Sequence, residues 1–445
     1  MSLLTASDKA LWRLALPMIF SNITVPLLGL VDTAVIGHLD SPVYLGGVAI
    51  GATATSFLFM LLLFLRMSTT GLTAQAYGAK DPLRLARALV QPLILALGAG
   101  ALIVVLRASL IDLALHIVGG SEAVLAQARR FLEIRWLSAP ASLANLVLLG
   151  WLLGVQYARA PVILLVVGNL LNIVLDVWLV MGLHMNVQGA ALATAIAEYG
   201  TFIIGLWMVR RVLAMRGISL ALLKTAWRGN IRKLLALNRD IMLRSLLLQL
   251  CFGALTVFGA RLGPEIVAVN AVLMTLLTFT AYALDGFAYA VEAHSGQAYG
   301  ARESGQLREV WRAACRQSGL VALAFGLVYA CFGEQIVALL TSLPALRELA
   351  SHYLIWQVVL PVVGVWCYLL DGMFIGATRG AEMRNSMAVA AAGFGLTLLT
   401  LPWLGNHGLW LALAVFLSLR GLSLAFIWHR HWQNNTWFPS RSDIS

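Results

Sequence analysis

Apolar residues form long continuous runs along this chain, and most polar residues lie in the segments between the runs. A run of about 20 apolar residues is long enough to cross the hydrocarbon layer of a bilayer as an α-helix. The pattern therefore predicts twelve membrane-spanning helices, at 11–37, 44–67, 86–106, 136–157, 160–183, 187–209, 241–262, 266–289, 309–331, 352–378, 384–404 and 408–429.

The composition excludes the other broad classes of protein. Hydrophobic residues make up 60% of the chain and charged residues 11%, with a mean hydropathy of +0.85, whereas a soluble domain has about 25% charged residues. A soluble fold could not cover its surface with so few charges, and a disordered chain would contain fewer apolar residues. The runs are continuous rather than alternating, which favours helices over a membrane barrel.

Lysine and arginine indicate the orientation, because they gather in the cytoplasmic loops of membrane proteins. With the N-terminus inside, most of them fall in inner segments, and the outer loops hold only Arg107, Arg129, Arg130, Arg135, Arg261 and Arg347. We therefore expect a multi-pass protein of the inner (cytoplasmic) membrane with both termini in the cytoplasm. The same asymmetry accounts for the net charge of +11 without a nucleic-acid partner.

An internal repeat divides the chain in half. The hexapeptide QAYGAK at 75–80 returns as QAYGAR at 297–302, which is 222 residues later, and both copies follow the second span of a half. The predicted fold is an all-α polytopic membrane protein with two six-helix lobes related by a pseudo-two-fold axis along the membrane normal. We expect an N-terminal lobe over 1–209, a basic amphipathic linker helix on the cytoplasmic face over 210–240, a C-terminal lobe over 241–429 and a cytoplasmic tail over 430–445.

Polar side chains inside the first-half spans are the strongest functional candidates, because a charged group in hydrocarbon is costly. Asp32, Asp176 and Thr194 are each about 8–10 Å below the outer ends of their predicted helices, so they can meet in one layer. Asn172 shares the helical face of Asp176 at a spacing of four residues. The further candidates are Asn169, which is on that face too, Glu198, which is one turn deeper than Thr194, and Asn145 in the fourth span.

The repeat provides an internal comparison for these residues. At the offset of 222, Asp32 matches Ala254, Asn172 matches Phe394 and Asp176 matches Leu398. A purely architectural polar group would have a counterpart in both copies, so the one-sided cluster favours function. Burial raises the pKa of a carboxyl, and nearby hydrogen-bond donors lower it. A carboxyl that is subject to both effects can hold a proton and release it. The alternative is a hydrogen-bonded carboxyl that only locks helix packing.

The second half contains a different polar set, with Asp285 in the eighth span and Asp371 in the tenth. Arg66 in the second span lies at a depth similar to that of Asp285, so the two could form an inner gate, although permanent structural pairing is an equal alternative. Pro17 and Pro26 in the first span remove backbone hydrogen bonds and allow that helix either to bend during transport or to keep a fixed kink.

No enzyme, nucleotide-binding or metal-binding motif stands out. The chain lacks HExxH, GxxxxGK[ST], GxSxG and CxxCH patterns, and its histidines show no ligand spacing. We expect no enzymatic activity, no cofactor and no firm metal site. Energy for transport would then come from an ion gradient rather than from ATP.

The motifs together resemble the multidrug and toxic compound extrusion (MATE) family, and within it the prokaryotic DNA-damage-inducible protein F branch. The resemblance rests on the early Ala-Leu-Pro17 sequence, on VDTAVIG at 31–37, on Asn172-x-x-x-Asp176 and on GAALAT at 189–194, in this order within a twelve-span repeat. It implies two lobes in a V and secondary export of drug-like, often cationic, compounds against inward protons or sodium.

The resemblance also implies roles for single residues. Asp32, Asn172, Asp176 and Thr194 would form the proton or cation site, and Pro17 would be the bending proline. Other branches use a carboxylate in the seventh span together with one in the tenth, where this chain has Asp371 but neutral residues such as Gln249. This difference favours protons, although sodium at Asn172, Asp176 and Thr194 remains an alternative.

The expected function is therefore an exporter that antiports small organic molecules against inward protons by alternating access, and that acts as a monomer in the lipid bilayer. Two other classes stay open. A flippase for a lipid-linked precursor would need a strongly cationic cavity, for which only Arg66 and Arg420 are candidates. An intramembrane enzyme would need motifs that the chain lacks.

Overall fold

The structure is a computed structural model that describes residues 4–39, 41–229 and 231–439; within 24–33 it describes the backbone alone. Every regular element in these ranges is a helix, so the prediction of an all-α membrane protein is confirmed. The chain divides into two compact units. We call residues 23–233 the N-terminal unit, and residues 1–22 with 234–445 the C-terminal unit.

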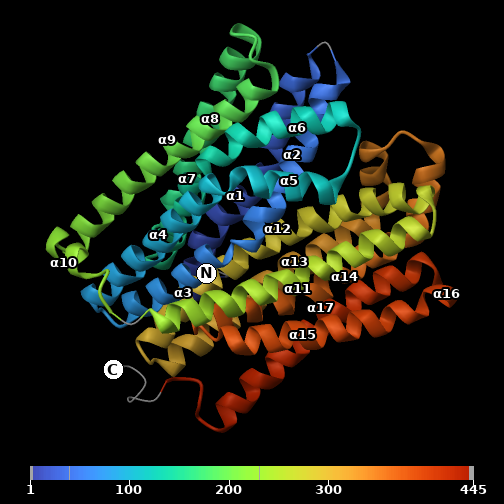
Figure 1. Cartoon of the computed structure of the whole chain (residues 1–445). Coiled ribbons are helices and arrows are strands. Elements are labelled where there is room, and N and C mark those ends of the chain that lie inside the picture. Colours follow the sequence, from blue (N-terminus) through green and yellow to red (C-terminus); the bar gives the residue numbers. More distant parts are fainter. Residues whose placement is uncertain (1–3, 40, 230, 440–445) are drawn as a thin grey trace. The chain divides into compact units, whose positions relative to one another are not determined.

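The helices up to residue 225 are blue to green in Figure 1, and all of them belong to the N-terminal unit except for the start of the first helix, which belongs to the C-terminal unit. These helices are α1 (Ala6–Gly37), α2 (Pro42–Leu61), α3 (Phe64–Gly78), α4 (Pro82–Val105), α5 (Arg107–Val118), α6 (Glu122–Arg135), the 3₁₀-helix η1 (Trp136–Ser138), α7 (Ala139–Gly154), α8 (Arg159–Asp176), the π-helix η2 (Val177–Gly182), α9 (Asn186–Met215) and α10 (Leu220–Thr225).

The C-terminal unit contains the remaining helices (yellow to red in Figure 1). They are α11 (Arg232–Arg261), α12 (Pro264–Gly300), α13 (Ser304–Leu340), α14 (Pro344–Gly376), α15 (Gly380–Thr397), the 3₁₀-helix η3 (Leu398–Thr400), α16 (Leu401–Leu404) and α17 (Asn406–Gln433).

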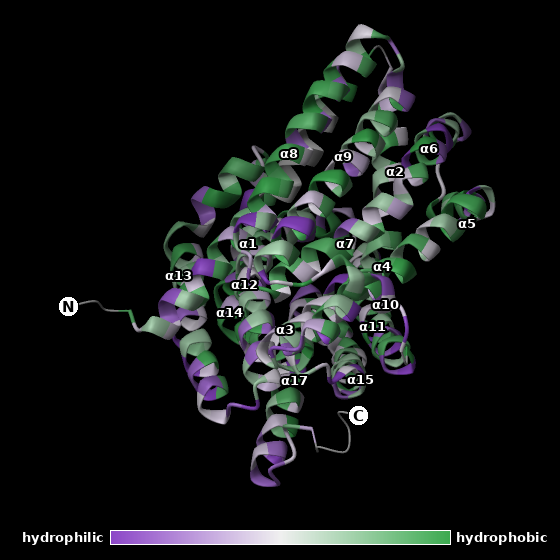
Figure 2. Ribbon diagram, turned by 90° about the vertical axis from the view of Figure 1, so that its left-hand side faces the viewer, coloured by the Kyte–Doolittle hydropathy of each residue, from purple (hydrophilic) through white to green (hydrophobic). Residues whose placement is uncertain are grey.

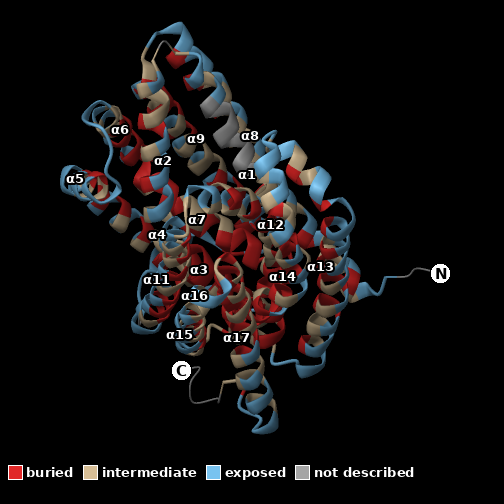
Figure 3. Cartoon of the chain, turned by 90° about the vertical axis from the view of Figure 1, so that its right-hand side faces the viewer, coloured by how far each residue is buried: buried red, intermediate tan, exposed pale blue. Residues whose placement is uncertain are grey.

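Eleven helical stretches in the described ranges are long and apolar enough to cross a membrane, and they match predicted spans two to twelve in order. Hydrophobic residues predominate along these helices in the colouring of Figure 2. Most of the helices in Figure 3 carry buried, intermediate and exposed positions, whereas α7 has no exposed residue. Several helices are longer than predicted. For example, α13 has 37 residues, about 55 Å at 1.5 Å per residue, because hydropathy marks only the part of a helix that lies in lipid.

Local sequence signals set where several helices begin. Asp81 caps α4 by accepting hydrogen bonds from the backbone N–H groups of Leu83 and Arg84, at 3.2 and 3.3 Å. Proline occupies the first position of α4 at Pro82, and of α12 at Pro264, where its missing N–H costs nothing. The single helix predicted over 210–240 is divided in the structure. Helix α9 continues to Met215 and α11 begins at Arg232, and among the described residues between them only the six of α10 form a helix.

The helix crossings inside each unit repeat at the same offset as the sequence. Helix α3 crosses α7 at Gly150, where an added Cβ would lie 2.7 Å from the carbonyl oxygen of Arg66. Helix α12 crosses α14 at Gly372, where an added Cβ would lie 2.7 Å from the carbonyl oxygen of Ala288. Both glycines and both carbonyls are 222 residues apart. Close backbone approach at a small residue therefore holds the two helix pairs in the same way.

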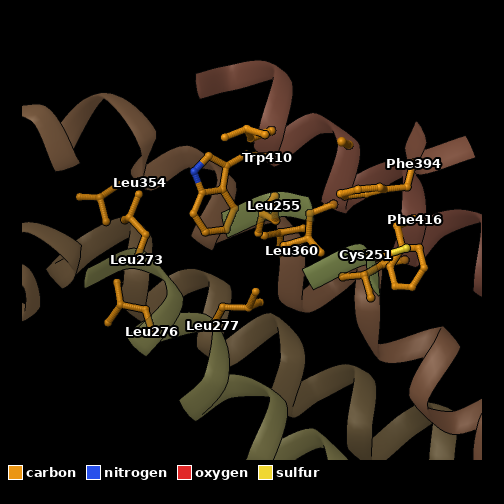
Figure 4. Packing of buried hydrophobic residues seen from close by; sticks show 14 of the residues in the cluster. Cys251, Leu255, Leu273, Leu276, Leu277, Leu354, Leu360, Phe394, Trp410 and Phe416 are labelled. Atoms are coloured by element: carbon orange, nitrogen blue, oxygen red, sulfur yellow. The ribbon is translucent and has the colours of Figure 1, made fainter. Parts of the chain in front are cut away.

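Each unit has its own apolar core. In the N-terminal unit, Trp136 and Trp151 are fully buried in two neighbouring clusters. In the C-terminal unit, Leu273, Leu360 and Trp410 pack together between α12, α14 and α17 (Figure 4).

The start of α1 belongs to the C-terminal unit, which differs from the lobe boundary predicted from the repeat. The Trp12 indole donates a hydrogen bond to Gln317 at 2.9 Å, Asp8 pairs with Arg316 at 3.1 Å, and the Asn22 amide donates to the Tyr282 carbonyl at 3.2 Å. These contacts to α12 and α13 hold the first turns of α1, and no sequence pattern indicated them.

The repeated hexapeptide contacts the segment that follows the last long helix of its own unit, α9 or α17. In the N-terminal unit, the Arg216 guanidinium lies over the Tyr77 ring at 4.7 Å. In the C-terminal unit, Phe438 stacks on Tyr299 at 5.6 Å, and Trp437 is buried beside it. Tyr77 and Tyr299 are 222 residues apart, as are Arg216 and Phe438. The tyrosine of each hexapeptide copy therefore has an equivalent structural contact in its own unit.

Candidate coupling site

Three of the four principal candidates lie close together in the N-terminal unit. Asn172 and Asp176 are one turn apart on α8, and their residues are 2% and 0% exposed. The Thr194 hydroxyl on α9 donates to the Asn172 side-chain oxygen at 3.4 Å and to the Ala190 carbonyl at 3.1 Å. The structure thus places a buried carboxyl, an amide and a hydroxyl at the α8–α9 contact.

The helix changes its geometry directly after Asp176. Helix α8 ends there and continues as the π-helix η2, in which the Leu183 N–H donates to the Trp178 carbonyl at 2.9 Å. The C-terminal unit changes at the equivalent place, where α15 ends and η3 begins at Leu398. Because both copies have the break, it belongs to the architecture, whereas the carboxyl occurs in one copy only.

Asp32 and Pro26 lie within α1, but their side chains are outside the described part of the chain. Pro17 is also within α1 and is half-buried. Bending at either proline and participation of Asp32 therefore stay predictions. Asn169 is half-buried on α8, three residues before Asn172.

Glu198 and Asn145 form a second polar contact in the same unit. The Asn145 amide on α7 donates to the Glu198 carboxylate and to its backbone carbonyl, both at 3.1 Å. Arg135 at the end of α6 pairs with the same carboxylate at 3.6 Å. The sequence interpretation counted Arg135 in an outer loop, whereas the structure places this residue within the helical stretch Glu122–Gly154 and leaves it 8% exposed. Because the last residues of the 107–135 segment are polar, the hydropathy pattern did not show that the helix continues from Glu122 to Gly154.

Asp371 lies between two arginines inside the C-terminal unit. The Arg244 guanidinium on α11 donates to one Asp371 oxygen at 2.6 Å, and the Arg420 guanidinium on α17 donates to that same oxygen. All three side chains are 10% exposed or less. The sequence interpretation noted Asp371 and Arg420 but counted Arg244 among cytoplasmic charges, and its pairing was missed.

The two residues of the predicted inner gate lie in different units. The Arg66 side chain is buried on α3 and donates to the Thr70 hydroxyl at 3.3 Å. Asp285 is half-buried on α12, within electrostatic range of Tyr282 and Tyr368 of its own unit. Neither observation tests whether the two residues meet.

No group of three or more His, Cys, Asp or Glu side chains that could hold a metal ion occurs among the described residues. Amide, hydroxyl and carboxyl oxygens at Asn172, Thr194 and Asp176 are nevertheless the ligand types that a small hard cation prefers. The chemistry of the site therefore suits either a proton or sodium.

The family model MatE matches residues 17–178 and 241–416. The chain therefore belongs to the multidrug and toxic compound extrusion family, a family of multi-pass membrane transporters, and the resemblance based on the motifs is confirmed. It is 84% identical over 440 residues to DNA damage-inducible protein F of Escherichia coli (strain K12), which covers 99% of this chain and 96% of that protein.

More distant relatives and solved structures match this chain over most of its length. The chain is 24% identical to a probable multidrug resistance protein NorM of Acinetobacter baylyi, over 92% of this chain and 93% of that protein. Among solved structures, a MATE crystal structure in the straight conformation has a TM-score of 0.84 at 22% identity, over 97% of both chains. An outward-facing multidrug resistance MATE transporter has a TM-score of 0.82 at 22% identity, over 97% of this chain and 96% of that one. At this identity the likeness concerns the fold.

Proposed function

We propose that this chain is a secondary active exporter that antiports drug-like, often cationic, compounds against inward protons by alternating access. The observation that carries the proposal is the buried cluster of Asn172, Asp176 and Thr194, which one half of the repeat has and the other lacks. A carboxyl in this setting can change its charge when water reaches it. We further propose an inner-membrane monomer with both termini in the cytoplasm.

Sodium coupling is the second candidate, because the Asn172 and Thr194 oxygens lie beside Asp176. A flippase for a lipid-linked precursor is less well supported, because it would need cations that can bind the precursor and Arg420 is already paired with Asp371 inside its own unit. The coupling ion can be decided directly by transport measurements.

Purified protein in liposomes should move a fluorescent organic cation when a pH gradient is imposed, with no lipid precursor present. A protonophore should stop this transport, and replacement of sodium by potassium should leave it unchanged. Transport that continues without a pH gradient and scales with sodium would instead establish sodium coupling. A wild-type protein that moves no cation under either gradient would contradict the proposed function.

We keep Arg66 and Asp285 as a proposed inner gate that closes the cleft to the cytoplasm. A charge at this depth is costly when it is separated from its counter-charge, so water would have to reach the two side chains when the gate opens. Arg66→Asp should impair export, and adding Asp285→Arg should restore part of it. An absence of recovery in a well-expressed double variant would count against a direct pair.

A further inference from the structure

The contact between Glu198 and Arg135 extends the polar layer of the coupling site deeper into the N-terminal unit. Glu198 is one turn beyond Thr194 on α9. Thr194 and Glu198 are 8 and 12 residues from the start of α9 at Asn186, which corresponds to about 12 and 18 Å along the helix. With the proposed orientation, Glu198 is therefore the more cytoplasmic of the two.

The cation of this pair is fixed, whereas the anion is accessible. Arg135 donates to the Ser138 hydroxyl at 2.6 Å, and its guanidinium lies over the Phe59 ring at 5.4 Å. The Arg135 side chain is 10% exposed, but that of Glu198 is 29% exposed. Their N–O separation of 3.6 Å is longer than the roughly 2.7–2.9 Å of a charge-assisted hydrogen bond. Arg135 thus acts on the carboxylate as a nearby charge rather than as a tight clamp.

The other half of the repeat has a charge of the opposite sign at this position. Glu198 matches Arg420 at the offset of 222. Arg420 is paired with Asp371, which Arg244 also contacts, and these side chains are nearly inaccessible. Among the described residues, the charged partner of Glu198 is Arg135 alone, and Asn145 is its amide donor. At this position the N-terminal unit therefore has a partly exposed acid, whereas the C-terminal unit has a buried ion pair.

We propose that Glu198 is a second proton-binding group of the transport pathway, placed after the coupling site on the way inward, with Arg135 as its positioning residue. A proton that has passed the coupling site binds a carboxylate oxygen of Glu198 and makes it neutral, and it then leaves to water on the cytoplasmic side and restores the anion. Arg135 stays in place through Ser138 and Phe59 during this cycle. Because a neighbouring cation favours the ionised form of an acid, Arg135 promotes the release step.

This inference rests on the proposed proton-coupled function, and the test separates the two. Wild-type protein, Glu198→Gln and Glu198→Gln with Arg135→Gln are compared in liposomes with a fluorescent organic cation and a pH gradient. We expect Glu198→Gln to lose gradient-driven export, and the double variant to remain inactive although it no longer contains the buried Arg135 cation. Glu198→Asp, which keeps an acid, should retain part of the export.

The positioning role of Arg135 has its own readout. A neighbouring cation favours the ionised form of an acid, so if Arg135 acts in this way the pH profile of export in Arg135→Gln should shift to higher cytoplasmic pH. Arg135→Lys should restore the profile. The exposed pair of Arg129 and Asp112 is the matched control, and its double neutralisation to Gln and Asn should change neither the rate nor the profile.

The outcomes are distinct. Wild-type export with equal export by Glu198→Gln would overturn this inference alone, as would full recovery in the double variant, which would make the pair structural. An unshifted profile in Arg135→Gln would remove the positioning role. Inactive wild-type protein would instead contradict the proposed function.

Discussion

Asp176→Asn should abolish gradient-driven export while the protein still folds and inserts in the membrane. Asparagine has nearly the same shape as aspartate and so fits the buried α8–α9 contact, where Asp176 is 0% exposed. It cannot release a proton, however, so the coupling ion would have no binding group there. The measurement is uptake of a fluorescent cation into liposomes under a pH gradient, together with the thermal midpoint of the purified variant. We expect the same result for Asp32→Asn.

The matched control is Leu398→Asn, which places an asparagine at the repeat-equivalent position of the C-terminal unit. Leu398 packs against the core of that unit at the start of η3. Leu398 is half-buried, and an unpaired amide costs about 1–3 kcal/mol when it is fully buried, so this change should lower the thermal midpoint by part of that amount and leave coupling intact. Export by Asp176→Asn at the wild-type rate would remove this carboxyl from the mechanism.

Much of the fold could be predicted from the sequence because the membrane restricts the choices. Backbone polar groups in lipid must be satisfied internally, so a long apolar run is a helix, and the order of the runs gave the order of helices. The hexapeptide offset of 222 recurs in the crossings at Gly150 and Gly372. The spacing of Asn172 and Asp176 placed both on one helical face, and the structure brings Thr194 to Asn172.

Contacts between helices distant in the chain could not be predicted in the same way. The depth of a residue follows from its place in a span, but the rotation of its helix does not. Asp371 was therefore recognised without Arg244, and Glu198 without Arg135. The docking of α1 on Gln317 and Arg316 depends on side chains more than 300 residues away, and no local pattern encodes it.

Asp371→Leu should strongly destabilise the C-terminal unit. The change would leave the buried cations of Arg244 and Arg420 without the carboxylate that both contact. Removal of one partner of a buried ion pair costs about 3–5 kcal/mol in the free energy of unfolding, because an uncompensated charge remains. Thermal unfolding in detergent, followed by the fraction of monodisperse protein, should show a large fall in the midpoint.

Adding Arg244→Met and Arg420→Met to Asp371→Leu should recover most of the lost stability, since replacement of all the buried charges by apolar side chains is often neutral or favourable. The exposed pair of Arg312 and Glu309 provides the control, and Glu309→Gln should change stability by no more than about 0.5 kcal/mol. Wild-type stability in Asp371→Leu would show that the arginines find other partners. A stable triple variant that exports at the wild-type rate would make these charges structural, whereas a stable triple variant without export would assign Asp371 to the coupling pathway.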